Sequence, residues 1–81
     1  MLLTLVDHEA FDYKDPTRSV LSEMTSDHVP AVGDLIKDGH RLSSFTVYRV
    51  EARMFRFRPV KNGEKADFTR VYLAVSTQAS H

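Results

Sequence analysis

The sequence predicts a small, mainly β domain, either a barrel or a strongly bent antiparallel sheet of four or five strands. Runs of β-branched and aromatic residues alternate with polar ones, which is the pattern of half-buried strands. Turn-forming Gly, Pro and Asn residues separate these runs about every eight to twelve residues. The 81-residue chain, 42% apolar, is long enough for one hydrophobic core and too short for two.

The first two elements are a strand over residues 1–6 and at most one short helix near residues 16–24. Leucine and β-branched residues fill the opening segment, which ends at Asp7. Asp15-Pro16 is typical of a helix start, because Asp accepts N-terminal backbone hydrogen bonds and Pro is tolerated at the first helical position. The following apolar segment is shorter than an isolated helix requires, so a strand stays open as the alternative.

The middle of the chain predicts two turns around a short strand. Gly33-Asp34 supplies the first turn and Leu35-Ile36 forms the strand. Asp38-Gly39 readily adopts positive φ, so we expect a tight hairpin there, or a longer loop that extends to Ser44.

The strongest strand signal runs from Phe45 to Phe57, where neither Gly nor Pro occurs. Because this length exceeds that of a usual strand, we expect a bend inside it. Strict alternation places four apolar residues on one side: Tyr48, Val50, Ala52 and Met54. After Met54 the alternation changes, because Phe55 and Phe57 stand at positions of the polar side. A β-bulge near Met54 would return Phe55 and Phe57 to the core, whereas without a bulge both rings are exposed.

The remaining elements are a hairpin turn over residues 61–65, a last strand over 68–75 and a flexible tail over 76–81. We therefore expect one domain over residues 1–75. The predicted core consists of Phe45, Val47, Val50, Ala52, Met54, Val71, Leu73 and Val75.

A family resemblance supports a barrel. The segments Val29–Ile36, Phe45–Val50 and Val71–Leu73 resemble the layout of small SH3-like β-barrel proteins of bacteria and bacteriophages, over residues 29–75. The resemblance implies a binding or assembly module and an origin in a phage or mobile element. It implies no catalytic residue.

Charge is unevenly distributed although the formal net charge is zero. Residues 1–40 carry three basic and eight acidic side chains, a charge of −5, and residues 41–81 carry eight basic and three acidic ones, a charge of +5. This asymmetry has three interpretations: surface ion pairs within one molecule, complementary faces of two molecules, or a basic strip that binds nucleic acid.

The candidate contact surface is the basic and aromatic part of the long strand and the residues that follow it. Its members are Arg49, Arg53, Phe55, Arg56, Phe57, Arg58 and Lys61. Aromatic and arginine side chains are typical of protein interfaces, and the same composition also suits phosphate contacts with base stacking. The sequence thus predicts a non-enzymatic protein-interaction or assembly module that self-associates, with nucleic-acid binding through residues 48–61 as the alternative.

Several function classes find no support in the sequence. The chain has no cysteine, no phosphate-binding glycine loop and no nucleophile motif, so we expect neither an enzyme nor a cofactor. His8, His28 and His40 stand near acidic residues, but nothing in their spacing brings three donors together, so no metal site is predicted. No apolar run is long enough to cross a bilayer and no signal peptide is recognisable, which favours a cytoplasmic protein.

Overall fold

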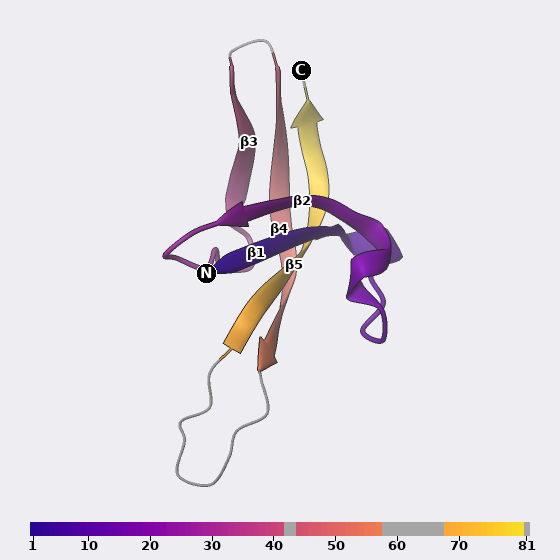
Figure 1. Ribbon diagram of the computed structural model, residues 1–81. Coiled ribbons are helices and arrows are strands. Elements are labelled where there is room, and N and C mark those ends of the chain that lie inside the picture. Colours follow the sequence, from indigo (N-terminus) through magenta and orange to yellow (C-terminus); the bar gives the residue numbers. More distant parts are fainter. Residues whose placement is uncertain (42–43, 58–67, 81) are drawn as a thin grey trace, which may run out of the picture.

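The computed structural model describes residues 1–41, 44–57 and 68–80 (Figure 1). The described chain is mainly β, as predicted, and forms five strands: β1 (Leu2–Asp7), β2 (Val20–Thr25), β3 (Leu35–Arg41), β4 (Ser44–Phe57) and β5 (Phe68–Ser80). Two short 3-10 turns, η1 (His8–Ala10) and η2 (Pro16–Ser19), lie between β1 and β2. Within this described part, no helix has the length and apolar character that crossing a bilayer requires.

The five strands form one strongly curled sheet in the order β2-β1-β5-β4-β3. β1 and β2 cross the long ribbon that β3, β4 and β5 form, which gives the sheet the shape of a half-barrel (Figure 1). Neighbouring strands are antiparallel except β1 and β5, which are parallel. The strongly bent, mainly antiparallel sheet is thus confirmed, and it includes one parallel pair because β1 and β5 are not joined by a hairpin.

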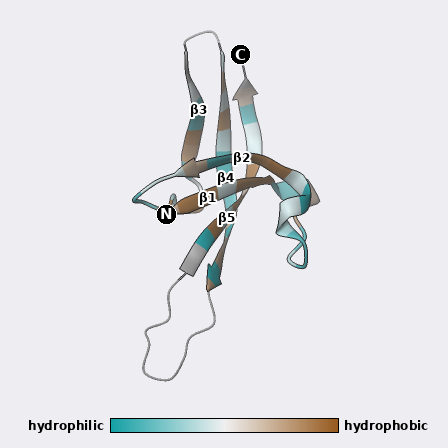
Figure 2. Cartoon of the chain, in the orientation of Figure 1, coloured by the Kyte–Doolittle hydropathy of each residue, from teal (hydrophilic) through white to brown (hydrophobic). Residues whose placement is uncertain are grey.

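Burial is concentrated on β1 and β5, the two central neighbours in the sheet order, and it affects both sides of the sheet. One side, which we name the Leu73 face, buries Leu3, Leu5, Tyr48, Val50, Val71, Leu73 and Val75. The opposite side, the Tyr72 face, buries Val6, Tyr72 and Ala74, and Phe11 packs against them. Figure 2 shows the apolar run along β1. Such nearly continuous apolar runs, interrupted in β1 by the buried Thr4, are typical of strands that are buried on both faces.

The predicted core is correct for four of its eight residues. Val50, Val71, Leu73 and Val75 are buried. The other four, Phe45, Val47, Ala52 and Met54, are only partly buried. Ala52 and Met54 pack on the Tyr72 face, and Phe45 and Val47 occupy the alternate positions of β4 that point away from the Leu73 face.

The segment over residues 16–24 resolves into a single 3-10 turn followed by a strand. Pro16 occupies the start of η2, and the Asp15 carboxylate accepts a hydrogen bond from the Thr17 hydroxyl at 2.8 Å. β2 then pairs with β1 and bulges at Leu21, because Leu5 lies opposite Ser22 and Val6 opposite Val20. The short helix does not extend past Ser19, since pairing with β1 satisfies the backbone of the residues that follow.

The turn at Gly33-Asp34 is confirmed, whereas the turn at Asp38-Gly39 is not. Gly33 has φ of +96°, and Asp34 Oδ2 accepts a hydrogen bond from the Ala31 N–H at 2.8 Å. β3 instead continues through Gly39, at φ of +113°, as far as Arg41. A Cβ on Gly39 would lie 2.6 Å from the Ser44 carbonyl oxygen, so this glycine permits close strand approach rather than a chain reversal.

The C-terminal residues form strand rather than the predicted flexible tail. β5 continues to Ser80, and its last residues pair with Thr46, Val47 and Tyr48 of β4. The length of β4 explains the difference, because it offers backbone partners far beyond Val75. The predicted hairpin over residues 61–65 lies outside the described residues.

Candidate interaction surface

A single bulged residue in β4 decides which side chains form the candidate surface. Val50 lies opposite Val75 and Ala52 lies opposite Ala74, so Glu51 is the extra residue. Its carboxylate accepts a hydrogen bond from the Ser76 hydroxyl at 2.7 Å. The predicted bulge is thus present, but at Glu51 and not near Met54. The alternation of side chains is reversed three residues earlier than the sequence pattern suggested.

The bulge brings Arg53 and Phe55 onto the Leu73 face. Arg53 lies opposite Leu73, and Phe55 lies opposite Val71. The Arg53 guanidinium carbon is 5.5 Å from the centre of the Phe55 ring, a cation–π distance. Phe55 is nevertheless 37% exposed, because the buried part of this face ends near Val71.

Phe57 extends this surface along β4. It stands two residues after Phe55, on the same side by the alternation of the strand, and is 56% exposed. We name Arg53, Phe55 and Phe57 together the Arg53–Phe57 surface. Strand β3 pairs with residues of β4 no further than Arg49, so β5 is the described neighbour of this part of β4.

The other predicted contact residues do not join this surface. Arg49 lies opposite Ser76 and Arg56 lies opposite Arg70, which places both arginines on the Tyr72 face. Both side chains are exposed. Arg58 and Lys61 lie outside the described residues. The basic strip expected from the sequence is therefore divided between two sides of the sheet.

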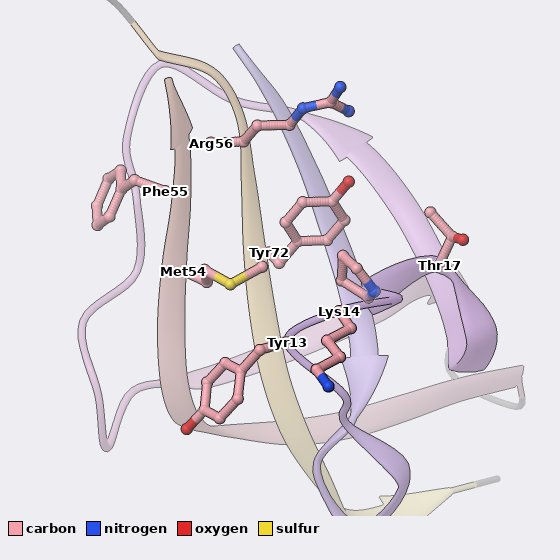
Figure 3. Close-up of a pocket in the computed structure, with 8 residues that line it drawn as sticks. Tyr13, Lys14, Thr17, Met54, Phe55, Arg56 and Tyr72 are labelled. Atoms are coloured by element: carbon pink, nitrogen blue, oxygen red, sulfur yellow. The ribbon is translucent and has the colours of Figure 1, made fainter. Parts of the chain in front are cut away.

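A cleft on the Tyr72 face was not predicted from the sequence. Its volume is about 420 Å³, and it is lined by Tyr13, Lys14, Pro16, Thr17, Met54, Phe55, Arg56 and Tyr72. Figure 3 shows the Phe55 ring on the far side of β4, turned away from Met54, Arg56 and Tyr72. The segment before β2 thus forms one wall, and β4 and β5 form the other.

One sequence feature is related to this cleft. In the segment that forms its wall, Asp side chains repeatedly accept a hydrogen bond from a group two residues later. The Asp7 carboxylate accepts from the Glu9 N–H at 3.1 Å, and the Asp12 carboxylate accepts from the Lys14 N–H at 2.9 Å. Such turns are typical of Asp and give a loop a defined shape. They could have indicated that residues 7–17 are an ordered wall.

Residues 1–41, 44–57 and 68–80 contain no group of three His, Cys, Asp or Glu side chains placed to hold a metal ion. His8 and His28 are exposed, and the His28 N–H donates to the Ser26 hydroxyl oxygen at 3.1 Å.

Comparison with known proteins gives no relative from which a function could be transferred. No protein-family model matches the chain, and neither characterised proteins nor solved structures give a match.

Proposed function

We propose that this chain is a non-enzymatic protein-interaction module of the cytoplasm that self-associates through the Arg53–Phe57 surface. The observation that carries the proposal is the exposure of Phe55 and Phe57 on the side of β4 that, before Glu51, forms the core. Aromatic and arginine side chains contribute most to the free energy of binding at protein interfaces. Three such residues in succession on one face of a strand therefore favour an interface.

A second copy of the chain is the partner that the charges favour. The segment from Asp7 to Asp15 contains four acidic residues, Asp7, Glu9, Asp12 and Asp15, whereas the proposed surface contributes Arg53. Complementary charges of this kind accelerate association and select the orientation of the partners. Identical molecules that carry both charges are suited to pair in a closed, symmetric arrangement.

Sedimentation velocity over a range of protein concentrations tests this proposal. We expect the wild-type chain to form dimers or larger species below about 100 μM, and Phe55→Asp to remain a monomer with an unchanged circular dichroism spectrum. Leu35→Asp is the matched control, because Leu35 is 66% exposed on β3 and outside the proposed surface. A wild-type chain that is monomeric throughout this range rules the proposal out.

A second variant keeps the test valid if Phe55→Asp does not fold. Arg53→Glu reverses a charge on the same surface at an exposed position. It should weaken self-association while the thermal transition stays unchanged. Unimpaired assembly of Arg53→Glu, together with unfolding of Phe55→Asp, would assign Phe55 to the core instead of to an interface.

Nucleic-acid binding is the second candidate function, and one contact favours it. The stacked pair of Arg53 and Phe55 is a platform of the kind on which single-stranded bases stack. The separation of Arg49 and Arg56 onto the other face weakens this candidate. Fluorescence anisotropy with a labelled mixed-sequence oligonucleotide, at about 50 and then about 200 mM salt, distinguishes the two functions, because phosphate contacts are strongly salt-dependent. An absence of binding at the lower salt concentration eliminates nucleic acid as the ligand.

A further inference from the structure

Two arginines lie directly opposite each other on the Tyr72 face. Arg56 of β4 pairs in register with Arg70 of β5, on antiparallel strands. Like charges at directly opposite positions of a sheet are destabilising, so this arrangement carries a free-energy cost in the absence of nearby negative charge. Glu23 lies 4.0 Å from the Arg70 guanidinium and offsets part of it. Two arginine side chains of neighbouring strands thus lie on the face that carries the cleft.

The cleft adds a third cation and several hydroxyl groups. Arg56 lines one side of the cleft and Lys14 the other, while Tyr13 and Thr17 contribute hydroxyls. The Arg70 guanidinium carbon is 5.9 Å from the centre of the Tyr72 ring, which is itself part of the cleft wall. Figure 3 shows Arg56 and Tyr72 on the same side of β4. Two cationic side chains and three hydroxyl groups, those of Tyr13, Thr17 and Tyr72, therefore line one concave site.

The wall that carries Lys14 is ordered by contacts within its own segment. The Asp12 carboxylate accepts from the Lys14 N–H at 2.9 Å, and the Phe11 and Tyr13 rings meet edge to face with centres 5.2 Å apart. The Asp15 carboxylate accepts from the Thr17 hydroxyl. A wall fixed in this way reduces the conformational entropy that a ligand must remove on binding.

We propose that this cleft binds a small phosphate monoester with a flat apolar body. A doubly charged phosphate presents several oxygens to neighbouring guanidinium groups, which bind it through charge-assisted hydrogen bonds. Met54, Pro16 and the Tyr72 ring supply apolar contacts for the remainder of the ligand. The volume of about 420 Å³ is that of a small-molecule site.

A polynucleotide fits this site less well than a single phosphate group. Glu23 stands beside Arg70, and Asp12 and Asp15 flank Lys14 in the ordered wall. These carboxylates would repel the next phosphates of an extended backbone. The site also goes beyond the proposed interface, because it lies on the Tyr72 face, whereas the Arg53–Phe57 surface lies on the Leu73 face.

The probe for this proposal is phenyl phosphate, titrated into the ¹⁵N-labelled full chain and followed by amide chemical shifts. Inorganic phosphate and benzyl alcohol are matched probes that carry only the charge or only the apolar ring. We expect phenyl phosphate to shift the amide signals of residues 13–17, 54–56 and 72, with affinity about tenfold higher than either matched probe. Equal responses to phenyl phosphate and benzyl alcohol, or shifts that do not centre on the cleft, would refute the proposal.

Three charge-removing variants complete the test. Lys14→Gln and Arg56→Gln should each weaken phenyl phosphate binding about tenfold, because both side chains line the cleft. Arg49→Gln should leave it unchanged, because Arg49 is exposed on the same face of β4 but does not line the cleft. Undiminished affinity in both cleft variants overturns the proposal. Arg53→Glu separates this proposal from self-association, because Arg53 does not line the cleft and an Arg53→Glu chain with weakened self-association should still bind phenyl phosphate.

Discussion

The two parts of β4, before and after Glu51, present different side chains to the same face of the sheet. Before Glu51 the Leu73 face carries Tyr48 and Val50, which are buried, and after it carries Arg53 and Phe55, which are exposed. The first part is flanked by β3 and β5, whereas the second has β5 as its described neighbour. One bulged residue, together with the end of β3 pairing at Arg49, therefore changes the residues on this face of β4 from core residues to a candidate interface.

An aspartate substitution should have its largest difference in effect on folding between Val50, before the bulge, and Phe55, after it. Val50→Asp should unfold the chain, because a carboxylate with no partner in the core costs several kcal/mol, and an 81-residue domain has only about 4–12 kcal/mol of stability. Phe55→Asp should retain the fold. Circular dichroism with urea unfolding checks both variants, and a folded Val50→Asp chain would contradict the assigned burial.

Alanine substitutions at Leu73 and Arg53, which lie opposite each other, should lower the free energy of unfolding by unequal amounts, and by less than an aspartate at Val50. Leu73 is fully buried, so Leu73→Ala should lower the free energy of unfolding by about 2–5 kcal/mol. Arg53 lies opposite it and is exposed, so Arg53→Ala should change this free energy by no more than about 0.5 kcal/mol. Urea titrations of both variants measure the difference, and equal losses would mean that Arg53 contributes to core packing.

The contact of β3 with the first part of β4 depends on Gly39. Gly39→Ala should cost about 1–3 kcal/mol, since φ is +113° and the added Cβ would lie 2.6 Å from the Ser44 carbonyl oxygen. Gly33→Ala is the matched control, because φ is also positive there but no atom lies within 4 Å of the added Cβ. Thermal unfolding should show a larger loss for Gly39→Ala, and the reverse order would contradict the close approach of the two strands.

The smallest expected effect concerns the ion pair of Glu23 with Arg70. Both side chains are partly exposed and the charged atoms are 4.0 Å apart, so Glu23→Gln should change the free energy of unfolding by less than about 1 kcal/mol. Raising the salt concentration should diminish the difference between variant and wild type. A loss well above this value would show that Glu23 offsets the Arg56–Arg70 repulsion more strongly than a surface pair does.

The sequence was sufficient to predict the fold class and the position of most strands. Alternation and turn residues indicated β1, β4 and the first part of β5, because local propensity and burial agree there. The end of β5 was predicted as tail, since residues 76–80 are small and polar and only their pairing with β4 makes them strand. Pairing between residues distant in sequence leaves no local signal.

The candidate surface was predicted in part. Arg53, Phe55 and Phe57 were identified from composition, but their separation from Arg49 and Arg56 depends on the position of the bulge. A shift of three residues in a bulge changes which side chains share a face, and alternation alone does not locate it. The cleft was missed because Lys14 and Tyr72 are far apart in sequence and meet only through the fold.

The reversal of side chains at Glu51 determines which residues of β4 form the Arg53–Phe57 surface, and a NOESY spectrum of the chain with labelled methyl groups detects it. We expect cross-peaks between the Phe55 ring and the Val71 methyl groups, and between the Met54 methyl group and the Tyr72 ring, because these residues lie opposite each other. Cross-peaks between the Met54 methyl group and the Val71 methyl groups would contradict the reversal, because without an extra residue at Glu51 the pairing of Val50 with Val75 would place Met54 opposite Val71.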